Sequence, residues 1–114
     1  MTMNRQKQKK AILKAAKWIE SHPNNWNKYD FFGTDTERFY RGFDVMGATY
    51  PNKHTIFSTT DLLSGTLEVE TYISRNFPKK IVERIMFLND TAKDNKQAAR
   101  KVRAFVGAYF KQEN

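Results

Sequence analysis

Hydrophobic residues recur every three or four positions along much of this chain, which is the spacing of amphipathic helices. A first helix is expected over residues 4–21, and its apolar side consists of Ile12, Ala15, Ala16 and Ile19. Pro23 cannot continue a helix, so this one ends just before it. We expect residues 1–5 to fray, as chain ends commonly do.

The second half of the chain predicts three more helices. A capping cluster at residues 58–61 precedes apolar residues at helical spacing that run to Asn76, although Gly65 weakens the first turn and makes Thr66 an alternative start. A second helix is expected over residues 78–88, where Pro78 suits the first turn. After a polar loop, the last helix spans residues 94–111.

The middle of the chain is harder to interpret, because residues 26–57 hold nine of the 16 aromatic residues. We expect a turn at Gly33 and a helix over residues 36–48, capped by Thr34 or Asp35. A short hairpin within residues 37–58 is the alternative, since aromatic residues also favour strands. The prediction is a mainly α, single compact domain over residues 1–114, with about five helices.

Asp44 is surrounded in sequence by apolar residues. We expect it to face solvent on an amphipathic helix. The alternative is a buried carboxylate, which would need a cation or backbone donors, since an unpaired buried charge is costly.

The net charge of +8 is concentrated at the two ends of the chain. Residues 1–19 carry +6, residues 93–114 carry +4, and the middle is slightly acidic at −2. On helices, these cations fall opposite the apolar sides, where they suit contacts to phosphate groups. The expected interface consists of Lys7, Lys10, Lys14 and Lys17 on the first helix and Lys96, Arg100 and Arg103 on the last.

We therefore expect a non-enzymatic protein that docks nucleic acid, a nucleoprotein complex or an acidic protein with little sequence specificity. Solubility alone is the competing explanation of the excess charge. The oligomeric state is open, with a dimer as one option.

A second hypothesis is a protein–protein effector that inhibits or recruits a host enzyme. Its contact residues would be an exposed aromatic patch formed by Trp26, Tyr29, Phe31 and Phe32. The third hypothesis is an enzyme that uses His54 with a nearby carboxylate.

Several functions are disfavoured by what the sequence lacks. Without cysteine there are no disulfides or thiolate metal sites. No catalytic, phosphate-loop or metal-binding motif occurs, so we expect neither cofactor nor metal. No apolar run approaches the roughly 20 residues that a membrane span needs, and the expected location is the cytoplasm.

The order of several short motifs resembles that of a known family. An Ala-Ala-x-x-Ile helix precedes Trp26, an apolar stretch ends in Gly47-Ala48, and a hydrophobic helix runs into Asn89-Asp90 before the last helix. This pattern, over about residues 11–110, is similar to a family of small uncharacterised helical domains of bacteriophages and actinobacteria.

The resemblance implies an all-helical fold and a phage or mobile-element setting, hence the cytoplasm of a bacterial host cell. The chain departs from the family pattern at two places: Phe43-Asp44 stands where the family has Cys, and Leu88 where it has Trp. Within the family pattern, Asn89-Asp90 is interpreted as a helix-capping turn.

Overall fold

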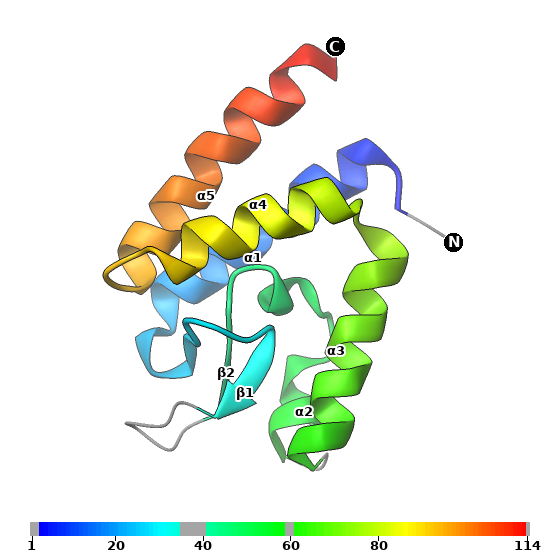
Figure 1. Ribbon diagram of the computed structural model, residues 1–114, viewed down its shortest axis with the longest axis vertical. Coiled ribbons are helices and arrows are strands. Elements are labelled where there is room, and N and C mark those ends of the chain that lie inside the picture. The colour runs from blue at the N-terminus through cyan, green and yellow to red at the C-terminus, as the bar shows by residue number, and fades with distance from the viewer. Residues whose placement is uncertain (1–2, 35–40, 59–60, 114) are drawn as a thin grey trace.

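The computed structural model describes residues 3–34, 41–58 and 61–113 (Figure 1). The helices of this part of the chain are α1 (Arg5–Ser21), α2 (Lys53–Ser58), α3 (Leu62–Asn76), α4 (Lys79–Asp90) and α5 (Asn95–Tyr109). Two short antiparallel strands, β1 (Phe32–Thr34) and β2 (Arg41–Phe43), form a hairpin. Three 3-10 turns complete the described elements: η1 (Pro23–Asn25), η2 (Gly47–Thr49) and η3 (Phe110–Glu113).

The mainly α, single-domain prediction is confirmed. The Cα radius of gyration is 13.2 Å, close to the roughly 13 Å expected of a compact chain of this size. One cluster of buried side chains connects all five helices and the hairpin. Figure 1 shows α4 crossing in front of α1, with α3 at one side of the molecule.

Helix α1 forms where the pattern predicts it. Asn4 is its N-cap and accepts a hydrogen bond from the backbone N–H of Lys7, so one of the helix's free donors is satisfied. Its predicted apolar side is buried, and Gln8 is buried beside it. Gln8 donates to the backbone oxygens of Met3 and Asn76, which ties the start of α1 to the end of α3.

Helices α1 and α5 pack against each other in antiparallel orientation. At one end, the Asn95 side chain donates to the backbone oxygens of Ile19 and Glu20, at 2.9 and 3.1 Å. These carbonyls belong to the last turn of α1, where helices leave acceptors free. At the other end, the Arg5 guanidinium lies 4.9 Å from the ring centre of Tyr109. The first and last helices therefore form one unit.

The helix predicted over residues 36–48 is wrong for the described residues 41–48, which form β2 and η2. The reason is close packing of backbone and rings. A Cβ on Gly42 would lie 2.6 Å from the Asn25 backbone oxygen, and Phe43 packs 4.9 Å from Phe32 and 5.2 Å from Phe57, centre to centre. The alternative hairpin is correct in kind, but its first strand precedes residues 37–58.

Of the two proposed caps, Asp35 lies outside the described residues. Thr34 itself belongs to β1 and pairs with Arg41. Helix α2, over Lys53–Ser58, was not expected from the sequence. Helix α3 begins at Leu62 with Asp61 as its cap, so Gly65 lies inside its first turns. The glycine leaves room for the Phe32 ring, since a Cβ on Gly65 would lie 2.8 Å from Phe32 Cε2.

Asn89 does not cap a helix, contrary to the interpretation of Asn89-Asp90 as a capping turn. Helix α4 continues to Asp90 and Thr91 caps it. The buried Asn89 oxygen accepts from Trp26 Nε1 at 2.8 Å and from the Val45 backbone N–H at 3.2 Å. Its amide nitrogen donates to the backbone oxygens of Asn27 and Lys28. Asn89 thereby holds two irregular segments against α4.

Candidate nucleic-acid interface

The four lysines predicted on the first helix share its outer side. Lys7, Lys10, Lys14 and Lys17 are all exposed, and their spacing of three, four and three residues keeps them on one side of the helix. The opposite side of α1 is buried in the core. The stripe rises about 15 Å along the helix axis between its first and last lysine, at about 1.5 Å per residue.

The three cations predicted on the last helix lie together near the end of α1. Lys96 and Arg100 are exposed, and Arg103 is half-buried. Arg103 forms an ion pair of 2.7 Å with Glu20. Its hydrogen bond lowers the pKa of the Glu20 carboxyl, and the charges of Lys96 and Arg100 act in the same direction. All three cations therefore surround one carboxylate of α1.

We call these seven residues the basic face: Lys7, Lys10, Lys14, Lys17, Lys96, Arg100 and Arg103. Glu20 is the one acidic residue in α1, and α5 contains none. Lys17 precedes Glu20 by one helical turn, so the α5 cations meet the C-terminal half of the α1 stripe. The packing thus brings together two charged segments that are far apart in the sequence.

Lys53, at the start of α2, extends the basic face and was missed from the sequence. Its ammonium donates to the backbone oxygens of Ala48 and Tyr50 and lies 5.3 Å from the Trp18 ring centre. Burial lowers the pKa of Lys53, and the nearby charge of Lys14 lowers it further. No local pattern around residue 53 indicates that this lysine would reach the α1 stripe.

The expected aromatic patch is not an exposed surface. Trp26 and Phe32 are buried, Phe31 is half-buried, and Tyr29 alone of the four is exposed, at 66%. Trp26 is fixed by its hydrogen bond to Asn89, and Phe32 by the hairpin and Gly65. These rings complete the core because the short strands offer too few aliphatic side chains to fill it.

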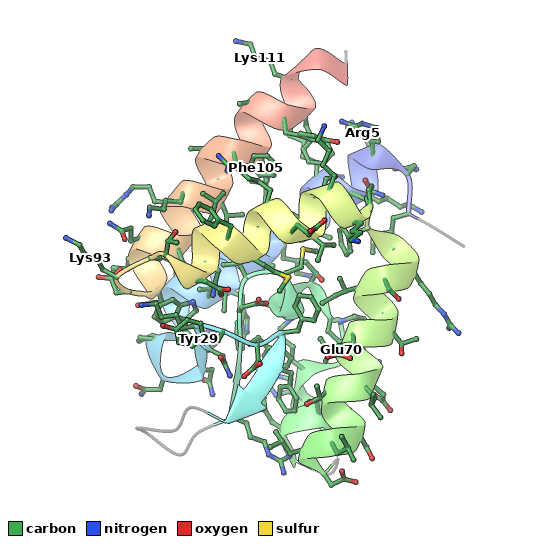
Figure 2. The ribbon with its side chains drawn as sticks, viewed as in Figure 1. Arg5, Tyr29, Glu70, Lys93, Phe105 and Lys111 are labelled. Carbon is green, nitrogen blue, oxygen red and sulfur yellow. The ribbon has the colours of Figure 1, made fainter. Side chains whose placement is uncertain are left out.

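A groove between α4 and α5, with a volume of about 750 Å³, was also missed. It is lined by Lys79, Lys80, Glu83, Arg84, Phe87, Phe105 and Tyr109. Figure 2 shows Phe105 on the side of α5 that faces α4. Phe105 and Tyr109 are both only half-buried.

Asp44 is fully buried, so the prediction that it faces solvent is wrong. With β2 and η2 in place of a helix, its Oδ1 turns inward and accepts from the Gly47 backbone N–H at 2.6 Å. Burial raises the pKa of Asp44 well above its ordinary value; the Gly47 bond opposes this, and the charges of Asp90 and Asp30 add to it. Oδ2 has no hydrogen-bond partner among the described residues.

The two histidines lie in different parts of the fold: His22 follows the last residue of α1, and His54 belongs to α2. The His22 Nδ1 is 2.7 Å from the Trp18 backbone oxygen, and its ring stacks on Trp18. His54 is exposed in α2. Within the described residues, no group of three or more His, Asp and Glu side chains is arranged to hold a metal ion.

The chain matches no family model, and comparisons with curated proteins and with solved structures found no match. The resemblance to the phage and actinobacterial family stays a prediction. Among the described helices, none combines the length and apolar character that crossing a membrane would require.

Proposed function

We propose that the protein is a non-enzymatic nucleic-acid-binding protein and that the basic face is its interface. The observation that carries the proposal is the pairing of α1 with α5. These two helices hold ten Lys and Arg side chains and one acid, and their packing brings the α5 cations to Glu20, at the C-terminal end of the α1 lysine stripe. Such a concentration of charge attracts a polyanion far more strongly than scattered lysines do.

The dimensions of the α1 stripe suit a phosphate backbone. Phosphates along one DNA strand are about 3.4 Å apart along the helix axis, so about 15 Å of α1 spans four or five of them. Lysine ammonium groups neutralise phosphates without reading bases, so we expect little sequence specificity. A nucleoprotein complex would present the same backbone.

The resemblance to phage and actinobacterial domains supports a setting for this activity. We infer that the protein acts in the cytoplasm of a bacterial cell, on nucleic acid of a phage or other mobile element. Expression from a phage promoter during infection, followed by fractionation of the host, would test this location.

The test of the interface is fluorescence anisotropy with a labelled duplex and a labelled single strand across a salt series. For about four phosphate contacts, the logarithm of the binding constant should fall with a slope of about −3 to −4 against the logarithm of salt. Affinity should then drop about 100-fold between 50 and 200 mM salt.

The decisive variant is Lys10→Glu/Lys17→Glu, which reverses two exposed charges of the basic face. Its matched control is Lys28→Glu/Arg75→Glu, which changes the net charge equally but lies on the loop before β1 and at the end of α3. We expect the first variant to abolish binding and the control to bind with nearly the wild-type slope.

Equal losses in the two variants would show that net charge alone drives binding and would refute the basic face as an interface. Absence of any binding at low salt would refute nucleic acid as the partner. The excess charge would then serve an acidic protein or solubility.

A further inference from the structure

The groove between α4 and α5 has an unusual lining, because all of its apolar side chains are aromatic. Phe87 comes from α4, and Phe105 and Tyr109 come from α5. Phe87 is 57% exposed, and the rings of Phe105 and Tyr109 lie 5.4 Å apart, centre to centre. A groove for an amphipathic peptide helix would present Leu, Ile or Met side chains instead.

Cations of α4 border these rings. Lys79, Lys80 and Arg84 line the α4 side, with Glu83 as the one acid in the lining. The Arg84 guanidinium lies 5.8 Å from the Phe87 ring centre. Outside this lining, Lys101 precedes Phe105 by one turn of α5, and the guanidinium of Arg5 in α1 lies 4.9 Å from the Tyr109 ring centre. The groove therefore combines three aromatic rings with three cations of α4.

From this combination we infer that the α4–α5 groove binds single-stranded nucleic acid, with unpaired bases stacked on Phe87, Phe105 and Tyr109. The inference rests on the proposed nucleic-acid binding and names the form of nucleic acid. Grooves that accept single strands combine rings for the bases with cations for the backbone. Bases in a duplex are stacked on each other, so their faces are closed to protein rings.

Helix α5 connects the groove to the basic face. Its edge toward α1 carries Lys96, Arg100 and Arg103, and its edge toward α4 carries Lys101, Phe105 and Tyr109. A strand that crosses α5 can therefore keep its phosphates on the basic face while its bases enter the groove. A duplex can use only the basic face.

The test compares three probes of equal length: a single-stranded oligothymidine, a duplex, and an abasic strand that has the backbone without bases. Stacking one base on one ring is worth about fivefold to 150-fold in affinity. Wild type should bind the oligothymidine at least about tenfold more tightly than the abasic strand.

Phe87→Ala is the informative variant, because this ring is mostly exposed and its loss leaves the core intact. We expect about tenfold weaker binding of oligothymidine and unchanged binding of the duplex and the abasic strand. Leu63→Ala is the matched control, since Leu63 is 70% exposed on α3. It should leave binding of all three probes unchanged.

A Phe87→Trp variant gives a second readout that does not depend on affinity. Bases stacked on the new indole should quench its fluorescence when oligothymidine binds, beyond the change that Trp18 and Trp26 give in wild type. The abasic strand should not quench it.

The outcomes separate this inference from the proposed function. If all three probes bind alike and Phe87→Ala changes none of them, the groove inference is overturned while the basic face stands. If Phe87→Ala weakens binding but Lys10→Glu/Lys17→Glu does not, the basic face is overturned and the groove stands. If no probe binds at low salt, both are overturned, and an acidic, aromatic-rich peptide becomes the occupant to test.

Discussion

At the scale of single residues, two of the buried polar side chains, Asn89 and Asp44, have opposite energetics. All four hydrogen-bonding positions of the Asn89 amide are used, so its burial is compensated. Asp44 has one paired oxygen and one that lacks a partner among the described residues. Asn89 therefore supports the fold, whereas Asp44 weakens it at neutral pH.

Replacement of Asp44 by Asn should stabilise the protein. The amide keeps an oxygen for the Gly47 N–H and removes the buried charge, which should raise the free energy of unfolding at pH 7 by about 1–3 kcal/mol. The pKa of Asp44 is raised in the folded state. The wild type therefore loses stability as the pH rises above the ordinary pKa of an Asp side chain, which is near 4. Urea denaturation between pH 4 and 8 measures this difference.

The gain in Asp44→Asn should accordingly be nearly gone at pH 4, where the carboxyl is neutral in the folded state and about half-protonated in the unfolded state. Glu70→Gln, at an exposed carboxylate of α3 (Figure 2), is the control and should stay within about 0.5 kcal/mol of wild type at every pH. A gain that is independent of pH would contradict the assignment of the cost to the buried charge.

The sequence shows these residues but not their roles. The motif around Asn89 is visible in the chain, yet its partners Trp26 and Val45 lie 63 and 44 positions away. Asp44 sits among apolar neighbours, which suits a buried residue as well as one on an amphipathic helix. Only the hairpin, which forms through contacts distant in sequence, decides between the two.

At the scale of elements, the long helices could be predicted because each carries its own periodic pattern and cap. Asn4, Asp61 and Asp94 each accept a hydrogen bond from the backbone N–H of the third residue after them. The hairpin and η2 could not be predicted in this way. Strands of three residues are too short to show an alternation of apolar and polar residues, and the shape of both elements depends on backbone contacts. Gly47 is one such contact, close to the Phe31 backbone oxygen.

Two glycine substitutions should act in opposite directions. A Cβ on Gly47 would lie 1.8 Å from the Phe31 oxygen, so Gly47→Ala should destabilise the protein by about 3 kcal/mol or more. A Cβ on Gly107 of α5 meets no atom within 4 Å, so Gly107→Ala should stabilise it by about 0.5–1 kcal/mol. Thermal unfolding of the pair measures both shifts, and shifts of equal sign would contradict the packing at Gly47.

At the scale of the whole molecule, the seven predicted cations lie on two helices that pack together. The sequence indicates each basic stripe, because charge opposite an apolar side is a local pattern. It does not indicate that α1 and α5 are neighbours, or that α4 and α5 leave an aromatic groove. The exposed aromatic patch predicted around residues 26–32 was wrong, because the side chains of Trp26 and Phe32 are buried in the core.

Removal of residues 95–114 should unfold the protein. The loss of the buried Val102 and Val106 alone costs about 3–6 kcal/mol, against a total stability of about 5–15 kcal/mol for such domains, and the buried side of α1 loses its cover as well. Circular dichroism should show no cooperative transition. Removal of residues 111–114 is the control, and a folded chain without α5 would contradict the α1–α5 core.

The packing of the first helix against the last also determines when the chain can fold during its synthesis. A ribosome that adds about 5–20 residues per second needs roughly 4–18 s between the end of α1 and the end of α5. During that interval the buried side of α1, which includes Ile12 and Ile19, lacks the cover that α5 gives it, because α5 has not been made. We therefore expect the native fold to form only after α5 has left the exit tunnel, and we expect α1 of the nascent chain to bind chaperones that shield apolar helices.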